Sequence, residues 1–200
     1  MESPSEMPAA PVSSDLPPAA HPSARRSRLI REVVETLLLI AIIFLIVNVT
    51  TGRFKIDGTS MEPSLHNEEY VLVDKVTYLL SPPQRGDVVV FYRDGDPKDY
   101  IKRVVGLPGE TVEVSNGSVY IDGLPLAEPY VTPFGGASPA RRLGVDEYFV
   151  MGDNRGNSQD SRIFGPIRRD NMVGRAWIVY WPPSDWALVQ HHSFAAAQAP

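Results

Sequence analysis

The sequence contains no cysteine, few histidines and no long basic stretch, and each shortage excludes a class of function. Without cysteine, the 200-residue chain has no thiol nucleophile, no thiolate metal site and no disulfide framework. Its four histidines, two of them adjacent near the C-terminus, are too few for a histidine-rich zinc centre, and we expect neither a metal nor a cofactor. The net charge of −5 and the lack of a stripe of Lys and Arg argue against nucleic acid as a partner.

The N-terminal quarter divides into a polar tail and an apolar run. Residues 1–28 are rich in proline, alanine and serine, which is typical of disorder because such a segment cannot bury enough apolar surface. Residues 29–50 are mostly apolar and long enough to cross a bilayer at about 1.5 Å of rise per helical residue. A cluster of arginines marks the junction: Arg25, Arg26, Arg28 and Arg31.

Three interpretations of the apolar run compete. A cleaved signal peptide needs small residues in an A-x-A arrangement after the apolar core, and residues 48–52 offer none. A buried core helix is rarely apolar on every face behind an arginine cluster. An uncleaved membrane anchor fits both observations. Because the arginines lie on the N-terminal side, we expect the N-terminus in the cytoplasm and the chain after Thr50 outside.

Residues 51–181 predict a mainly β catalytic domain with an antiparallel sheet. Short β-branched runs bounded by turn residues are typical of strands, and they lie at residues 70–74, 87–92, 111–114, 119–121, 147–151 and 176–181. No stretch beyond residue 52 shows convincing helical periodicity. We expect residues 128–142 to form a loop and residues 182–200 to form a flexible tail.

A candidate nucleophile, Ser60, lies in the segment DGTSMEPSL, with a glycine two residues before it and a proline three residues after it. Taken alone, such a serine is a turn hydroxyl that bonds the local backbone. As a nucleophile it needs a group that takes its proton. His66 lies in the same segment, but no spacing supports a Ser-His-Asp triad. A serine–lysine dyad is a recognised variant of the same logic.

The candidate base lies in residues 99–110, which contain two adjacent cations, Lys102 and Arg103. Strand alternation puts Lys102 on the face of Tyr100 and Val104 and puts Arg103 on the other face. One of them therefore points to the interior or a cleft, unless the strand is an edge strand whose cations reach water. Burial lowers the pKa of a lysine so that it can act as a base, whereas arginine stays protonated. If either cation is a base, it is Lys102.

A third polar segment, residues 152–162, contains no large apolar side chain although it follows a strand-like run. A solvated loop is the simplest interpretation. A calcium loop is a second one, but the acidic count is low and the closing bidentate glutamate is missing. Alternatively, these polar groups hydrogen-bond one another and frame a site.

Together these segments resemble the sequence boxes of bacterial type I signal peptidases (leader peptidases). Those are membrane-anchored serine–lysine proteases that remove signal peptides from exported preproteins. The similarity covers most of residues 30–181 and includes the N-terminal anchor. It is carried by GTSMEPSL around Ser60, RGDVVVF at residues 85–91, YIKRVVGLPGE at residues 100–110 and GDNRGNSQDSR at residues 152–162.

The resemblance implies a role for individual residues. Ser60 is similar to the family nucleophile and Lys102 to its general base. The resemblance also implies that Ser158 hydrogen-bonds and orients the lysine, and that Asp160 and Arg162 form a supporting pair. Substrates with small side chains at −1 and −3 would use shallow pockets lined by Phe54, Ile56, Leu65, Tyr100 and Ile101.

Two departures from the family pattern stand out. Some relatives carry a serine two residues before the nucleophile, whose hydroxyl helps to hold the oxyanion, and Gly58 occupies that position here. The stretch between Glu110 and Glu147 is short, so we expect any second β-subdomain to be reduced.

These observations predict a serine endopeptidase of the bacterial cytoplasmic membrane, monomeric and single-pass, whose partners are exported preproteins and the bilayer. A self-cleaving repressor of the serine–lysine type would need a DNA-binding helix-turn-helix, and the N-terminus offers a proline-rich segment and an anchor instead. An inactive tethered binding module would be indicated by loss of Ser60 or Lys102, and both are present.

Overall fold

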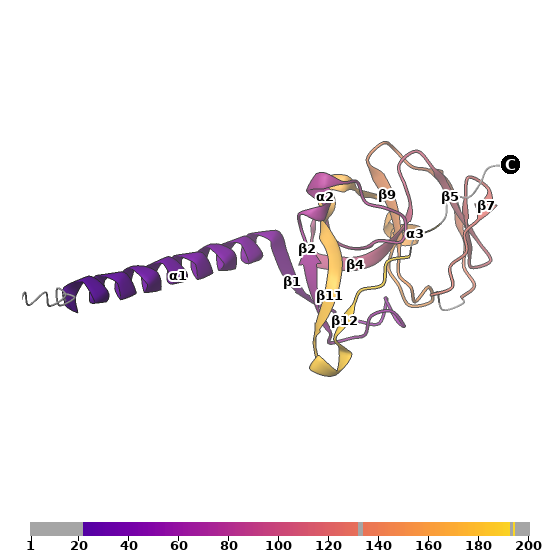
Figure 1. Ribbon diagram of the computed structural model, residues 1–200. Helices are drawn as coiled ribbons and strands as arrows, with labels where there is room; N and C mark the ends of the chain where they lie inside the picture. The colour runs from indigo at the N-terminus through magenta and orange to yellow at the C-terminus, as the bar shows by residue number, and fades with distance from the viewer. Residues whose placement is uncertain (1–21, 132–133, 193, 195–200) are drawn as a thin grey trace, which may run out of the picture. The chain divides into compact units, whose positions relative to one another are not determined.

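The computed structural model describes residues 22–131, 134–192 and 194. The chain forms two compact units, Met1–Leu45 and Ile46–Pro200. The first holds most of a long helix, and the second holds the end of that helix and the strands (Figure 1). The predicted disorder of residues 1–21 concerns a part of the chain outside the described residues.

Helix α1 (Pro22–Thr50) contains an apolar stretch of 23 residues, Arg28–Thr50. Its most apolar part has a mean hydropathy of 2.6, and none of that part is buried within the structure. Its length and composition suit a membrane span. We predicted disorder as far as residue 28, but residues 22–28 are helical. Proline is tolerated in the first turn of a helix, and the alanine and arginines that follow favour helical backbone.

The larger sheet has eight strands, all paired antiparallel. They are β1 (Thr51–Lys55), β2 (Tyr70–Asp74), β3 (Val88–Arg93), β4 (Asp96–Gly106), β9 (Glu147–Met151), β10 (Ile167–Arg168), β11 (Met172–Trp181) and β12 (Ala187–Leu188). The order is β1-β2-β11-β3-β4-β9-β10, and β12 pairs with β11. The prediction of a mainly antiparallel β fold with an N-terminal apolar helix is confirmed.

A smaller sheet has the order β7-β6-β5-β8. Its strands are β5 (Thr111–Ser115), β6 (Ser118–Ile121), β7 (Leu124–Pro125) and β8 (Ser138–Arg142). Asn116 and Gly117 join β5 to β6 with φ angles of 49° and 80°, the left-handed backbone that a tight hairpin turn requires. The expectation of a loop over residues 128–142 is wrong for β8. That strand lacks β-branched residues and forms because the free edge of β5 supplies its hydrogen bonds.

Four short helical turns connect the strands: α2 (Thr77–Leu80), α3 (Ser161–Phe164), η1 (Arg169–Asn171) and η2 (Pro183–Asp185). The prediction of a flexible tail from residue 182 is wrong for residues 182–192, which contain η2 and β12. Val189 gives the reason, because its side chain is only 7% exposed and packs in the main core. Burying a valine contributes about 1.5–3 kcal/mol, which opposes fraying of the segment.

The core that positions the site covers β2, β3 and β11 and includes the loop between β1 and β2. Ile56 precedes Ser60 in that loop and is buried, and Met61 and Leu65 follow it, each 1% exposed. The segment that carries Ser60 is therefore held in the core on both sides. The buried valines packed against it are Val71, Val73, Val88 and Val90.

Candidate active site

The structure brings Ser60 and Lys102 together, although they are 42 positions apart in the chain. Ser60 lies in the loop between β1 and β2, and Lys102 lies within β4. The Nζ of Lys102 is 2.7 Å from the Oγ of Ser60, and it also donates a hydrogen bond to the main-chain oxygen of Ile101 at 2.8 Å. A proton can therefore pass directly from the hydroxyl to the amine.

The environment of Lys102 favours its neutral form. The side chain is 4% exposed, and burial lowers the pKa of Lys102 to about 8. The carboxylates of Asp160 and Asp153 act in the opposite direction, because their charge stabilises the ammonium, but desolvation is the larger effect. The neutral amine is the form that accepts a proton, so this lysine can serve as a base at mildly alkaline pH.

Arg103, the neighbouring cation, is also buried, with 0% exposure. Its Nε and Nη2 bind the two carboxylate oxygens of Asp153 at 2.9 and 2.7 Å. The edge-strand alternative is wrong because β4 lies between β3 and β9. Sequence reasoning did not identify Asp153 as the partner, since nothing local links two residues 50 positions apart.

The loop around Ser60 is clamped by two amides that sequence reasoning missed. The main-chain N–H of Asn154 donates to the main-chain oxygen of Ser60 at 3.1 Å, and its side chain donates to the main-chain oxygen of Thr59 at 3.1 Å. Asn157 donates from Nδ2 to the hydroxyl oxygen of Thr59 at 2.7 Å. The only signal for these contacts in the sequence was the presence of Asn154 and Asn157 within a polar segment. The clamp fixes the backbone from which the hydroxyl of Ser60 projects.

The third polar segment is neither a solvated loop nor a calcium loop. Asp160 is fully buried, and Arg162 binds both of its carboxylate oxygens at 2.8 and 2.7 Å, so the pair implied by the resemblance is present. The same carboxylate accepts a hydrogen bond from the main-chain N–H of Gly152. Among the described residues, no group of three or more His, Asp or Glu could hold a metal ion.

Ser158 does not make the expected hydrogen bond to Lys102. Its Oγ is buried and has no hydrogen-bond partner among the described residues, while the amine of Lys102 is engaged by Ser60 and Ile101. The hydroxyl still lies beside the loop between β1 and β2, residues 56–69, which we call the nucleophile loop after the role expected of Ser60. A Cβ built on Gly152 would stand 2.3 Å from the Oγ of Ser158 and 2.4 Å from the main-chain oxygen of Ser60. Only glycine fits at that position.

The five residues expected to line the substrate pockets do not all come together. Four of them share one apolar cluster in which Ile56 and Leu65 are buried and the other two are half-buried: Phe54, Ile56, Leu65 and Ile101. Tyr100 is separate and packs in another cluster. Its ring stacks on Phe91 with centroids 5.7 Å apart, and its hydroxyl donates to Asp96 at 2.6 Å. Strand alternation gives the reason, because Tyr100 and Ile101 point to opposite faces of β4.

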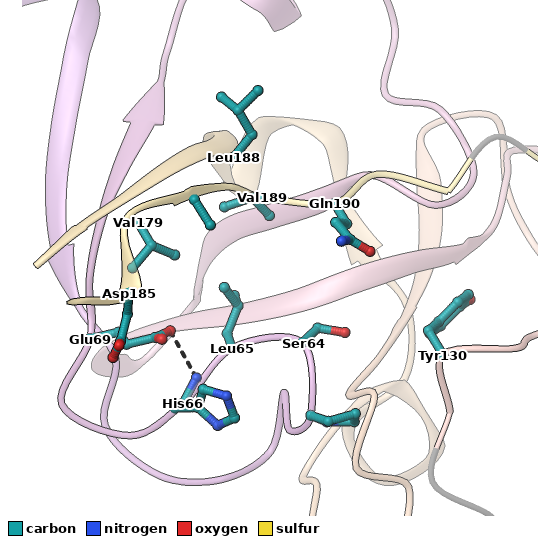
Figure 2. Close-up of a pocket in the computed structure, with 12 residues that line it drawn as sticks. Ser64, Leu65, His66, Glu69, Tyr130, Val179, Asp185, Leu188, Val189 and Gln190 are labelled. Atoms are coloured by element: carbon teal, nitrogen blue, oxygen red, sulfur yellow. Dashed lines mark hydrogen bonds between the residues drawn. The ribbon is translucent and has the colours of Figure 1, made fainter. Parts of the chain in front are cut away.

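A cavity of about 520 Å³ lies between the nucleophile loop and the chain after η2 (Figure 2). Neither Ser60 nor Lys102 lines it. His66 belongs to its wall, and the main-chain N–H of His66 donates to Glu69 at 2.8 Å, as Figure 2 shows. The remaining lining residues are Pro63, Ser64, Leu65, Glu69, Tyr130, Val179, Asp185, Ala187, Leu188, Val189 and Gln190.

A serine hydroxyl beside a buried lysine amine, on an antiparallel β fold, is the arrangement of a serine–lysine peptidase. The family model described as "Signal peptidase, peptidase S26" matches residues 29–181. The chain therefore belongs to this signal peptidase family and is a serine peptidase.

Curated relatives agree with the family model. The chain is 38% identical over 182 residues to "Probable signal peptidase I-1" of Synechocystis sp., covering 84% of this chain and 91% of that protein. It is 36% identical to signal peptidase I of Leptolyngbya laminosa, covering 91% of this chain and 94% of that protein. It is also 36% identical to a signal peptidase I of Bacillus amyloliquefaciens, covering 74% and 83%.

Proposed function

We propose that this protein is a membrane-anchored endopeptidase that removes N-terminal signal peptides from exported preproteins, with Ser60 as nucleophile and Lys102 as general base. The observation that carries the proposal is the distance of 2.7 Å between the serine hydroxyl and a lysine that is almost completely buried. The names of the curated relatives supply the substrate class, since each is called a signal peptidase.

The proposed mechanism has two steps that share one base. Neutral Lys102 takes the proton of Ser60 Oγ as the oxygen attacks the main-chain carbonyl carbon of the −1 residue. The tetrahedral intermediate collapses to an acyl-enzyme, and the lysine ammonium protonates the leaving amine of the mature protein. Lys102 then takes a proton from water as the water oxygen attacks the ester. The ester bond breaks, the signal peptide leaves as a carboxylic acid, and the lysine ammonium returns the proton to Ser60 Oγ.

The charge that develops on the carbonyl oxygen needs preorganised donors. The main-chain N–H of Ser60 is one candidate, and the clamp by Asn154 on the main-chain oxygens of Thr59 and Ser60 holds it in place. Gly58 supplies no hydroxyl. Its own N–H donates to the side-chain oxygen of Asn67 at 2.7 Å, so that donor is already used within the loop.

The supporting pair Asp160–Arg162 balances the charge near the base. Asp160 favours the ammonium form of Lys102. The guanidinium of Arg162, bound to both carboxylate oxygens, offsets that charge, so a buried carboxylate can order the loop at Gly152 without keeping the lysine protonated.

Substrate selection rests on the apolar cluster beside the dyad. Ile101 precedes the base in β4, and Leu65 follows the nucleophile in its loop. The buried side chains of Leu65 and Ile56 leave little room, which favours small residues at −1 and −3 of the substrate. Half-buried Phe54 and Ile101 complete the wall.

The membrane anchor would also bring the active site close to its substrate. The 23-residue apolar stretch of α1 suits a single span, and the arginine cluster at its N-terminal end favours an N-terminus in the cytoplasm and a β domain outside. Signal peptides are themselves apolar, so enzyme and substrate meet within one membrane and at raised effective concentration. The bacterial relatives support the cytoplasmic membrane as the location.

The decisive experiment incubates the detergent-solubilised full chain with a preprotein bearing an A-x-A site and follows the appearance of mature protein. Wild type should cleave after the A-x-A site, and Ser60→Ala should not cleave. A folded wild-type enzyme that leaves the preprotein intact would contradict the proposal.

A further inference from the structure

The chain that follows η2, residues 187–192, packs against three strands of the larger sheet, and we call it the C-terminal strap. It begins as β12, which pairs with β11. The main-chain N–H of Val189 then donates to the main-chain oxygen of Trp177 in β11 at 2.9 Å. Figure 2 shows Leu188, Val189 and Gln190 along one wall of the cavity, with Leu65 of the nucleophile loop on the facing side.

The ring of His191 ties the strap to two strands. Its Nδ1 accepts a hydrogen bond from the main-chain N–H of Val88 in β3 at 3.2 Å, and its Nε2 lies 2.9 Å from the main-chain oxygen of Ala176 in β11. A neutral imidazole protonated at Nε2 satisfies both contacts. Burial, with a further contribution from Arg175 that outweighs the opposing charge of Asp87, lowers the pKa of His191 to about 4. The ring is therefore neutral at pH 7.

The strap also supplies an acceptor to Arg103. This guanidinium is fully buried and has five N–H donors. Nε and Nη2 bind Asp153, and Nη2 also reaches Ser64 Oγ at 3.5 Å. Nη1 donates to the main-chain oxygens of Gly86 at 2.8 Å and Gln190 at 2.9 Å. Every donor thus has an acceptor, and the one on Gln190 belongs to the strap.

Arg103 and Asp153 both border the proposed dyad. Arg103 follows Lys102 in β4. Asp153 precedes Asn154, whose main-chain N–H holds the main-chain oxygen of Ser60. A displacement of Arg103 would therefore free the carboxylate of Asp153 and loosen the nucleophile loop at the same time.

The charged groups that act on Lys102 are few. Asp160 and Asp153 both favour its ammonium form, and each is held by an arginine. Across the sheet, β3 places apolar Val89 opposite Lys102. From the nucleophile loop, Ser60 contributes a hydroxyl. Of the two carboxylates, only Asp153 depends on the strap, because its arginine is the one bonded to Gln190.

We propose that the C-terminal strap is a positioning element of the active site. Through the main-chain oxygen of Gln190 it holds Arg103 on Asp153, and that pair keeps the nucleophile loop in register and the carboxylate of Asp153 away from the amine of Lys102. His191 is the positioning residue that fastens the strap. The inference rests on the proposed peptidase function for its kinetic test, whereas titration of Lys102 tests it without any substrate.

The test uses the detergent-solubilised full chain with three substitutions in the strap. His191→Ala removes both ring contacts. His191→Gln keeps a donor and an acceptor on its amide and should rescue them. Leu188→Ala is the matched control, because Leu188 is exposed and its main-chain pairing survives. Preprotein cleavage gives kcat and KM as a function of pH, and the ¹³Cε shift in lysine-labelled protein gives the titration of Lys102.

We expect His191→Ala to lower kcat about tenfold with little change in KM. The acidic limb of the pH profile of this variant and the titration midpoint of its Lys102 should both move to higher pH by about half a pH unit, which is a threefold change in the acid constant. The reason is that Asp153 and water then favour the ammonium form of Lys102. His191→Gln should restore both values, and Leu188→Ala should match wild type.

Unchanged kcat and titration in a folded His191→Ala protein would overturn the inference. A lower Tm with an unmoved titration of Lys102 would also overturn it, since a purely structural strap gives that result. If His191→Ala does not fold by circular dichroism, His191→Leu replaces it under the same criteria, and failure of both shows a role in folding and overturns the inference. Failure of the proposed function is separate, because wild type would then cleave nothing while the titration still reports on the strap.

Discussion

Arg103 and Asp153 form a bidentate ion pair in which neither side chain is exposed to solvent, and the pair joins β4 to the loop after β9. A buried pair contributes little compared with apolar packing, but removing one partner leaves an unpaired buried charge. The structure therefore depends on both residues together. This relationship leads to the first prediction.

Arg103→Met should lower the free energy of unfolding by about 3–5 kcal/mol, because Asp153 would remain buried without a counter-charge. Urea unfolding of the solubilised protein, followed by tryptophan fluorescence, measures the change. Lys55→Gln is the control, since its pair with Glu68 is exposed and should leave the midpoint unchanged. A loss below about 1 kcal/mol for Arg103→Met would show that the pair is dispensable.

Ser60→Ala and Lys102→Ala should each reduce preprotein cleavage by on the order of 10⁴-fold or more, and the double variant should be no worse than either. The reason is that the two groups act in one proton transfer. Lys102→Arg should be inactive too, because a guanidinium does not release its proton at working pH. His66→Gln serves as the control and should retain activity. Additive losses in the double variant would show that the two residues act separately.

The acidic limb of kcat/KM should have its midpoint near pH 8, the pKa to which burial lowers Lys102. Activity rises with pH through this range because only the neutral amine accepts the serine proton. Asp160→Asn should move the limb to lower pH, since Asp160 raises the pKa of Lys102 and Arg162 would then lack its partner. Glu113→Gln, exposed on β5, is the control. An upward shift for Asp160→Asn would refute the assignment of the limb.

The arginine cluster at the N-terminal end of α1 predicts the orientation of the protein in the membrane. Protease added to intact spheroplasts should digest the β domain and spare a tag placed at the N-terminus. Permeabilised cells should lose both, which controls for protease access. Protection of the β domain in intact spheroplasts would rule out the orientation and, with it, the substrate assignment.

The sequence predicted those parts of the fold that local patterns control. The strands around Val71 and Val89 follow from β-branched runs, and the β5–β6 hairpin follows from Asn116-Gly117. Strand β8 was not predictable, because its residues have weak strand propensity and its hydrogen bonds come from β5. The strap was missed for a similar reason, since Val189 is buried by residues distant in the chain.

The candidate site shows the same division. Segment motifs were enough to select Ser60 and Lys102 as candidates. Strand alternation predicted that one of the two adjacent cations points to the interior or a cleft, whereas the structure buries both Lys102 and Arg103. Partners at long range were not predictable: the carboxylate that binds Arg103 comes from another loop. The expected bond between Ser158 and Lys102 is absent: the amine bonds Ser60 and Ile101, and the Oγ of Ser158 is buried without a hydrogen-bond partner among the described residues.

The position of β11 between β2 and β3 has a consequence for the order of events during synthesis. Strands β2 and β3 leave the ribosome early, yet the larger sheet cannot close between them until residues 172–181 have been made. The apolar helix is complete long before that point and can enter the membrane first. Such non-local pairing makes folding slow and late. Under the proposed function, the anchor helix would therefore be in place before Ser60 of the β1–β2 loop and Lys102 of β4 come together in the closed sheet.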